Sequence, residues 1–369
     1  KPTKIILVSG IFLLIEFTRY FFLNGVPWLI PGNIFLDTIT QSTYSVFGVS
    51  FASLLIYLIC SIIVQYKKSR IAAIALVFLF ISLIPQNSNI IINNGIFVTA
   101  IQPSSNPFLK YEKDYYQKIE KNLLRLIKQS SQSSKLIVLP EAELPYHDKS
   151  GKFNSFLSKI NNKEKLLLGT WHYDENKLFN AFLNVKSDQV YKKIHLVPFG
   201  EYIPFFKSLR GLIDFFNLPM SNVDHGSKNQ TKMTVLNGLE VSTPICFDMA
   251  FPRTVRLMNK SSLFMINISN DTWFGESIGP YHHLSIARIR SVENNRWTLR
   301  ATNDGFSAII SNKGTIVDKL DKGDSNILEG YIDLIYKNSF YNKIGYIFSY
   351  LISFILISSI IIRFLWLKF

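Results

Sequence analysis

The sequence predicts an α/β globular domain combined with α-helical transmembrane segments. Hydrophobic residues make up 48% of the 369 residues and the mean hydropathy is +0.17, which is more apolar than a typical soluble domain. Long apolar runs lie near both ends of the chain, and between residues 85 and 342 short β-type runs alternate with helical patterns. Alternation of this kind is typical of an α/β or α+β sandwich.

The apolar runs near the two ends are predicted to be membrane spans. They extend from Ile5 to Leu23, from about Val46 to Val64, from Ile71 to Ile84 and from Ile344 to Leu367. Because a span needs about 20 apolar residues, the third run is short. No small-residue cleavage site follows the first run, so it is a poor signal peptide. We expect three spans in residues 1–84 and one in residues 343–369.

The charges between these runs predict an orientation. Lys67, Lys68 and Arg70 fill the loop between the second and third runs, and such loops lie in the cytoplasm by the positive-inside rule. Residues 85–342 then fall on the opposite face, which in a bacterial inner membrane is the periplasm. The net charge of +14 reflects lysines spread over the whole chain, so we expect no nucleic-acid partner.

The central region shows its elements in a regular order. A lysine-rich helix is expected over residues 111–129 and a second helix over 280–297, because both segments have helical spacing. Short apolar runs predict buried strands. In sequence order they are GIFVTAIQ (95–102), KLIVLPEAELP (135–145), KLLLGTWH (165–172), LFNAFLNV (178–185), LEVSTPICFD (239–248), SLFMINISND (262–271) and SAIISNKGTIV (307–317).

Three ionisable or nucleophilic residues stand at the ends of these strands, where α/β folds place reactive groups: Glu141, Lys193 and Cys246. The chain has two cysteines, and Cys60 lies in an apolar membrane run, so a disulfide with Cys246 is not expected. A thiol nucleophile needs a base and a cation to hold the developing negative charge. Each residue alone has an ordinary interpretation, as a core cysteine or as solvated charges.

The local wording around these residues resembles the apolipoprotein N-acyltransferases, membrane enzymes of the nitrilase superfamily. The resemblance covers nearly the whole chain and is carried by EFTRYFFLNGVPWLIPG (16–32), LPEAELP (139–145), KKIHLVPFGEYIP (192–204), LPMS (218–221), ICFD (245–248), ISNDTWFGESIGPYHHLSIARIRSVENNR (268–296) and RATNDGFSAII (300–310). It implies an α-β-β-α sandwich on the periplasmic face, in residues 85–342, anchored by the membrane segments. It implies no cofactor and no metal.

The resemblance also implies roles for individual residues. Cys246 would take an acyl chain from the sn-1 ester of a phospholipid as a thioester, and then pass it to the N-terminal amine of a diacylglyceryl-cysteine lipoprotein. Glu141 would be the base, and Lys193 would stabilise the oxyanion together with the backbone N–H after Cys246. Glu201 would position Lys193. Neighbouring strand residues face opposite sides, and the family spacing selects Lys193 over Lys192.

The chain departs from the family pattern at several supporting positions. Phe247 and Asp248 stand where the family usually has Tyr and Glu, so either a partner of the Asp248 carboxylate sits closer or the supporting shell is weaker. Tyr111 stands in place of the usual Trp. Trp273 and Phe274 match the family and are candidates for lining an acyl groove, although core packing would explain them equally well.

Further alternatives accompany this interpretation. The family has further membrane helices ahead of the Glu16 segment, so we expect this chain to be a fragment or a shortened form. A membrane-tethered carbon–nitrogen hydrolase (an amidase) using water as acceptor fits the three residues equally well, and an inactive lipid-binding scaffold is a further candidate. His195 is a competing base, and the adjacent His282 and His283 have no further ligand at metal-binding spacing.

Overall fold

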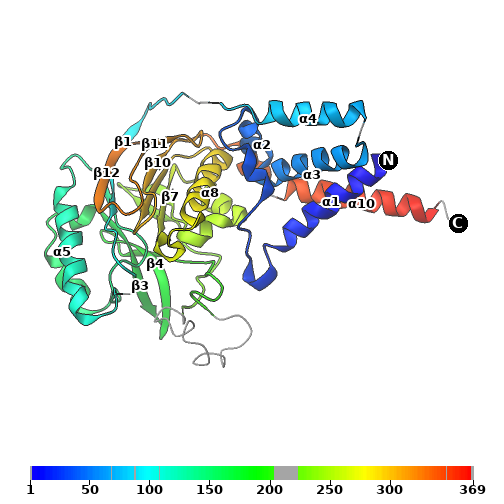
Figure 1. Cartoon of the computed structure of the whole chain (residues 1–369). Helices are drawn as coiled ribbons and strands as arrows, with labels where there is room; N and C mark the ends of the chain where they lie inside the picture. Colours follow the sequence, from blue (N-terminus) through cyan, green and yellow to red (C-terminus); the bar gives the residue numbers. More distant parts are fainter. Residues whose placement is uncertain are drawn as a thin grey trace.

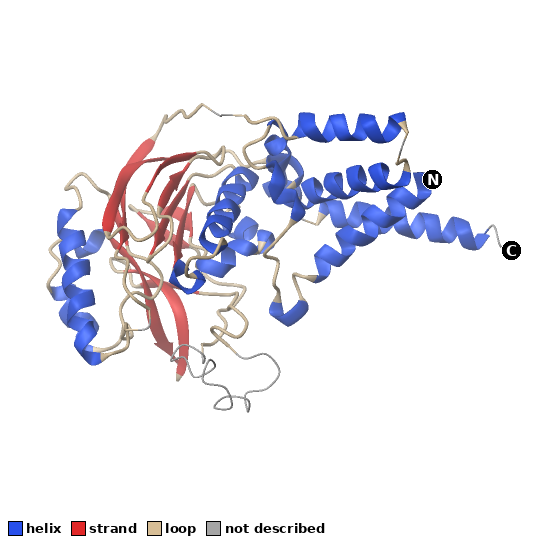
Figure 2. Ribbon diagram, in the orientation of Figure 1, coloured by secondary structure: helices blue, strands red, loops and turns tan. Residues whose placement is uncertain are grey.

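The computed structural model describes residues 2–67, 69–86, 89–107, 109–202, 223–345 and 347–366. The LPMS motif (218–221), Lys68 and Leu367 lie outside the described residues. Two six-stranded sheets face each other and form the centre of the molecule (Figures 1 and 2). Their facing sides enclose one apolar core, which includes Val98, Phe182 and Ile266.

The first sheet has the strand order β12-β1-β2-β3-β4-β5. Its strands β1, β2 and β3 are parallel neighbours, and the outer pairs are antiparallel. Parallel order follows from the crossover helix α5, Lys113–Gln129, which connects β1 to β2. The strands are β1 (Gly95–Gln102), β2 (Leu136–Val138), β3 (Leu166–Asp174), β4 (Lys177–Asn184), β5 (Gln189–Lys192) and β12 (Asn326–Asp333).

The second sheet has the order β11-β10-β9-β8-β7-β6, with β7, β8 and β9 parallel. The crossover between β7 and β8 contains α7 (Pro252–Met258), and the one between β8 and β9 contains α8 (Gly279–Asn294). The strands are β6 (Met233–Val235), β7 (Leu239–Ser242), β8 (Phe264–Ser269), β9 (Thr298–Thr302), β10 (Ala308–Ile310) and β11 (Ile316–Lys319).

Helices cover the outer face of each sheet. Leu123 of α5 and Phe156 of α6 (Gly151–Ser158) pack with Leu168 of β3 in one core. Val255 of α7 and Ala287 of α8 pack with residues of the second sheet in another. The layers are therefore helix, sheet, sheet and helix, as the α-β-β-α expectation has it.

The remaining helices gather on the side of the molecule opposite α5 (Figure 1). They are α1 (Pro2–Thr18), α3 (Val49–Gln65), α4 (Arg70–Ser82) and α10 (Phe348–Trp366), with the short helices α2 (Tyr44–Phe47) and α9 (Phe340–Ile344) nearer the sheets. Among the described helices, α10 alone is long and apolar enough to cross a membrane, while α3 and α4 are shorter apolar helices. The four predicted spans therefore remain a prediction.

One carboxylate ties three of these helices together. Glu16 of α1 is buried and accepts hydrogen bonds from the hydroxyls of Tyr57 in α3 and Tyr350 in α10, each at 3.2 Å. A polar side chain inside an apolar bundle is costly unless it finds such partners. These hydrogen bonds therefore fix the positions of α1, α3 and α10 relative to one another around Glu16.

Several sequence expectations differ in extent from the structure. The first apolar run does not stay helical to Leu23, because α1 ends at Thr18 and the chain turns through η1 (Phe22–Asn24). The segment 239–248 is a strand only as far as Ser242. Strands β6, β9 and β12 and helices α6 and α7 are not predicted by the sequence patterns, since each is short or carries polar residues that interrupt an apolar pattern.

Candidate active site

Glu141 and Lys193 meet at the ends of two strands of the first sheet. Glu141 follows β2, and Lys193 follows β5 directly. The Lys193 Nζ atom lies 2.8 Å from Glu141 Oε1, and the lysine is 1% exposed. Gly169 in β3 allows the backbone at Glu141 to lie against β3, because a Cβ at position 169 would lie 2.6 Å from the Glu141 Cα atom.

Glu201 closes the other side of the lysine. Its Oε2 atom is 2.9 Å from Lys193 Nζ and also accepts the backbone N–H of Val197 at 2.8 Å. Burial opposes the charge on Lys193, but the carboxylates of Glu141 and Glu201 outweigh it and hold the pKa of the ammonium well above its ordinary value. The lysine is therefore a permanent cation in this site.

Two asparagines that the sequence analysis did not single out complete the carboxylate network. The amide of buried Asn180 in β4 donates to Glu141 Oε1 at 2.7 Å and to Glu201 Oε1 at 2.8 Å. The backbone N–H of Asn270 donates to Glu141 Oε2 at 2.8 Å. A signal for Asn180 was present in the sequence, because a polar residue in the middle of the apolar run LFNAFLNV needs a partner when buried.

Cys246 begins η7 (Cys246–Ala250), a 3₁₀ turn at the end of the β7 segment of the second sheet. Its φ is +44°, a left-handed conformation that non-glycine residues adopt mainly where surrounding contacts impose it. Ile245, the residue before Cys246, forms a parallel β-bridge with Ile268 of β8, and this bridge fixes the position of the turn in the sheet. Burial, and then the Glu141 carboxylate, raise the pKa of the Cys246 thiol, and Lys193 opposes them in part. The resting group is a thiol that needs a base.

Asp248 braces the same turn from inside. Its carboxylate accepts the N–H of His195 at 2.8 Å, the hydroxyl of Tyr191 at 2.9 Å and the N–H of Ile245 at 3.2 Å. Burial raises the pKa of Asp248 to about 7 against these hydrogen bonds. The Asp248 side chain is shorter than the glutamate expected at this position, so either its partners lie closer or the support is weaker. This geometry favours closer partners.

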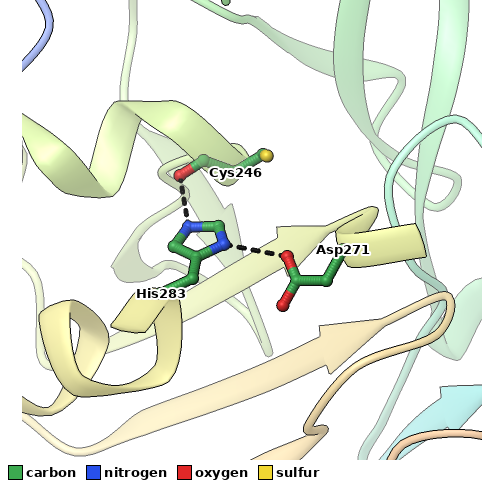
Figure 3. Close-up of side chains that lie close together, drawn as sticks. All are labelled: Cys246, Asp271 and His283. Atoms are coloured by element: carbon green, nitrogen blue, oxygen red, sulfur yellow. Dashed lines mark hydrogen bonds and ion pairs between the residues drawn. The ribbon is translucent and has the colours of Figure 1, made fainter. Parts of the chain in front are cut away.

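The carbonyl of Cys246 is held by a buried histidine (Figure 3). The His283 Nε2 atom of α8 lies 3.1 Å from the Cys246 oxygen, and Nδ1 lies 2.8 Å from Asp271 Oδ1. Arg300 of β9 binds the other Asp271 oxygen at 2.7 Å. Although burial opposes its charge, Arg300 and His283 hold the pKa of the Asp271 carboxyl below its usual range.

Cys246, Asp271 and His283 have ligand atoms within 4.8 Å of one another, which raises the question of a metal. The Arg300 Nη2 atom lies 2.7 Å from Asp271 Oδ2 and 3.1 Å from His283 Nδ1, so a guanidinium already occupies the cation position. The Cys246 sulfur points away from the imidazole in Figure 3. This cluster fits a hydrogen-bonded brace and not a metal centre.

Two sequence candidates lie apart from the reacting groups. Lys192 faces away from Lys193 and pairs with Asp174 at 2.5 Å. His195 stacks on Phe251, with ring centroids 3.5 Å apart, and its Nε2 lies 2.7 Å from the Thr254 hydroxyl. Burial, followed by the charge of Lys228, lowers the pKa of His195 to about 3. Neither geometry supports a catalytic role.

Aromatic side chains contact the Cys246 turn and the residue after Glu141. Trp28 stacks on Phe274 at 5.4 Å and lies 6.0 Å from the ring of Phe247, which is buried. Trp273 is 40% exposed. Tyr111 is partly buried against Ala142, the residue after Glu141. An apolar rim therefore borders the charged cluster, and its contribution to substrate binding remains a prediction.

Together these groups have the components for acyl transfer. A buried thiol can act as nucleophile, a carboxylate can accept its proton and an ammonium can stabilise an oxyanion. Both Glu141 and Lys193 lie close enough to Cys246 to alter the pKa of its thiol. The site needs no bound ion for this chemistry.

Comparisons with known proteins identify the family of the chain. Residues 97–338 match the carbon–nitrogen hydrolase family model. The chain is 30% identical over 347 residues to an apolipoprotein N-acyltransferase from Pseudomonas putida, covering 88% of this chain and 67% of that protein. An Aquifex aeolicus apolipoprotein N-acyltransferase is 30% identical over 318 residues, covering 83% and 70%.

A solved structure supports the fold. The Caenorhabditis elegans NitFhit protein superposes with a TM-score of 0.50 at 15% identity, covering 66% of this chain and 62% of that chain. At this identity the likeness concerns the fold alone. The two facing sheets and their outer helices are thus a nitrilase-like α/β architecture.

Proposed function

Because the chain belongs to the carbon–nitrogen hydrolase family, and within it to the apolipoprotein N-acyltransferases, we propose that it completes lipoprotein maturation. It is an acyltransferase. In this proposal the donor is a phospholipid, and the acceptor is the free N-terminal amine of a diacylglyceryl-cysteine lipoprotein. The transfer proceeds in two half-reactions through a thioester on Cys246.

The observation that carries the proposal is the buried contact among Glu141, Lys193 and Glu201 beside the Cys246 turn. An ammonium has three N–H donors, and the two carboxylates use two of them. One donor remains for an oxygen of the reacting ester. Lys193 is therefore suited to stabilise an oxyanion without losing its partners.

In the first half-reaction Glu141 takes the Cys246 proton while the sulfur attacks the ester carbonyl. Lys193 and the backbone N–H of Phe247 stabilise the oxyanion of the tetrahedral intermediate. The carbon–oxygen ester bond breaks, Glu141 returns its proton to the departing alkoxide, and a lysophospholipid leaves. The raised pKa of the Cys246 thiol supports this order, because the proton leaves only when the carboxylate can receive it.

In the second half-reaction the lipoprotein amine attacks the thioester carbonyl. A carbon–nitrogen bond forms, the carbon–sulfur bond breaks, and Glu141 passes the amine proton to the departing sulfur. The product is an amide, and Cys246 returns to its resting thiol. The rim of Trp28, Phe247 and Phe274 would shelter the acyl chain in both steps.

We place the protein in the bacterial inner membrane, with several spans and with the catalytic domain on the periplasmic side. The apolar helix α10 and the shorter apolar helices α3 and α4 support membrane insertion. The basic loop containing Lys67 and Arg70 supports the orientation. Domain limits of 1–84, 85–342 and 343–369 belong to the same proposal.

The test is the mass of the intact, detergent-purified protein after incubation with phosphatidylethanolamine. We expect an added acyl mass that hydroxylamine removes, and none on a Cys246→Ala variant. Glu141→Gln and Lys193→Met should lower the rate of adduct formation by at least about a hundredfold, as loss of a base or an oxyanion donor does. A folded wild-type protein with no adduct would favour the scaffold alternative.

The acceptor separates transfer from hydrolysis. Adding a diacylated lipopeptide with a free amine should release the adduct and yield an N-acyl peptide. Release of free fatty acid at the same rate with or without the peptide would indicate the membrane-tethered hydrolase instead. An N-acetylated peptide is the matched control, because it lacks the attacking amine.

A further inference from the structure

One cavity of the structure lies apart from the reacting residues. It has a volume of about 670 Å³ and is enclosed by the turn after α1, the segment 225–233 and helix α7. Glu141, Lys193 and Cys246 do not line it. The cavity is therefore separate from the three reacting side chains.

The charged groups that the described part of its wall contributes are basic. Lys228, Lys232 and Arg253 line it, and among the described lining residues none is acidic. Lys232 is partly compensated by Glu240 at 3.5 Å. Within the described ranges no ion pair involves Lys228 or Arg253. The effect of Lys228 on the pKa of His195 indicates that its charge reaches the cavity wall. Such a wall favours an anionic ligand.

The same cavity has hydroxyl and apolar parts. Thr243 and Thr254 supply hydroxyl groups of the kind that bind phosphate oxygens, whereas the hydroxyl of Ser242 already donates to Asn259. Phe21, 61% exposed, and Leu257, 42% exposed, lie at its edge. An exposed aromatic ring beside basic side chains is typical of a surface that meets a lipid bilayer.

The position of the cavity relative to the apolar helices identifies the class of ligand. Phe21 and Asn24 lie just beyond the end of α1, on the side of the bundle that faces the two sheets. If α1 crosses the membrane, as proposed above, this end lies at the headgroup level. A small polar anion would contact only the basic residues of the cavity. A phospholipid would contact the basic residues with its phosphate and the apolar edge with its acyl chains.

We propose that this cavity binds the phosphate-bearing headgroup of an anionic phospholipid, in a site separate from the acyl-donor site. Lys228 and Arg253 contact the phosphate, and the apolar edge contacts the start of the acyl chains. The bound lipid holds the catalytic domain against the membrane surface. The assignment rests on the proposed membrane location and not on the identity of the acyl acceptor.

The test is calorimetric titration of the full chain in a nonionic detergent with dihexanoyl-phosphatidylglycerol. We expect saturable binding that weakens by at least about tenfold in a Lys228→Ser/Arg253→Ser variant, since two charge-assisted contacts are lost. Lys135→Ser/Lys163→Ser is the matched control, because it removes the same charge from exposed lysines outside the cavity. Its affinity should equal that of the wild type.

Other outcomes would overturn the proposal. Equal affinity in the Lys228→Ser/Arg253→Ser variant would show that these residues do not bind the lipid. Equal affinity for dihexanoyl-phosphatidylcholine would remove the selectivity for an anionic headgroup, and equal affinity for glycerol 3-phosphate would identify a soluble anion as the ligand. The Cys246 adduct is measured on the same samples. Lipid binding without an adduct would count against the proposed transferase and leave the cavity assignment standing.

Discussion

At the scale of single residues, the contact between His283 and the Cys246 carbonyl identifies a positioning residue. The carbonyl oxygen can only accept, so this hydrogen bond forms in the His283 tautomer that carries its proton on Nε2. The bond holds a backbone with a φ of +44°, which an unsupported cysteine would rarely adopt. The position of the sulfur thus depends on a side chain that does not touch it.

We predict that His283→Leu slows formation of the Cys246 adduct by roughly tenfold to a hundredfold, as a misplaced reacting group does. It should also lower the free energy of unfolding by about 1–3 kcal/mol, because the buried Cys246 carbonyl loses its hydrogen-bond donor. His283→Gln should recover part of the rate, since its amide can donate to the same oxygen. Single-turnover mass spectrometry and denaturant titration measure the two effects. An unchanged rate in folded His283→Leu would contradict the positioning role.

The raised pKa of Asp248 leads to a pH prediction. The folded protein keeps the proton up to about pH 7, whereas an unfolded aspartate loses it near pH 4. Stability from this group is therefore complete below pH 4 and falls as pH rises toward 7, by about 1.4 kcal/mol per unit. Asp248→Asn cannot titrate, so its melting temperature should rise relative to wild type between pH 4.5 and 7. Parallel melting curves over that range would refute the prediction.

Sequence motifs identified the residues with distinctive chemistry but not those that support them. Glu141, Lys193 and Cys246 stand in short, specific contexts. Asn180 comes from an ordinary strand, and its role emerges only when β4 places its amide between two carboxylates. Asp271 belongs to the motif at residues 268–296, yet its ion pair with Arg300 joins residues of different elements. Such contacts depend on packing that local patterns do not contain.

At the scale of elements, a buried ion pair fixes α8 against the apolar helix α3. Glu293 pairs with Arg290 one turn earlier, and its Oε1 accepts the N–H of Val49 at the start of α3 at 2.8 Å. Arg290 in turn donates to the carbonyl of Met249 in η7 at 2.9 Å. One pair therefore links the helix behind the reactive turn to the first residue of an apolar helix.

We predict that Glu293→Gln lowers the free energy of unfolding by about 3–5 kcal/mol, because it leaves the Arg290 guanidinium buried without its carboxylate. Arg290→Met combined with Glu293→Gln should cost less than the sum of the two single variants, since no charge is then isolated. Denaturant titration in a fixed detergent gives the coupling energy. Additive losses would show that the two side chains act independently.

Long, uniform elements were predictable from their patterns, and irregular ones were not. The segment GIFVTAIQ forms β1 over the expected residues, and the spacing of PYHHLSIARIRSVENNRW appears as α8. β9, with the sequence TLRAT, carries the buried Arg300, so its apolar pattern is broken by a charge that only its partner Asp271, two residues after β8, explains. β12 has Gly330 at its centre, which weakens a strand pattern.

At the scale of the whole molecule, the proposed orientation is directly testable. In a Cys60→Ala background, Lys163→Cys places a thiol on the catalytic domain and Lys67→Cys places one in the loop between α3 and α4. An impermeant maleimide added to intact cells should label position 163 and not 67, because only the former faces the periplasm. Both should react after lysis. The reverse pattern would overturn the orientation.

Trp28 has a consequence for how such a protein can be divided. It comes from the N-terminal segment, yet its ring contacts Phe247, Phe274 and His283, and its carbonyl accepts from His282 Nε2 at 2.6 Å. It packs against two of the apolar cores at once. A chimera that joined this catalytic domain to the N-terminal segment of a relative would replace Trp28. The side chains that pack on the Cys246 turn would then change. The N-terminal segment and the domain that carries Cys246 therefore have to be complementary at this contact.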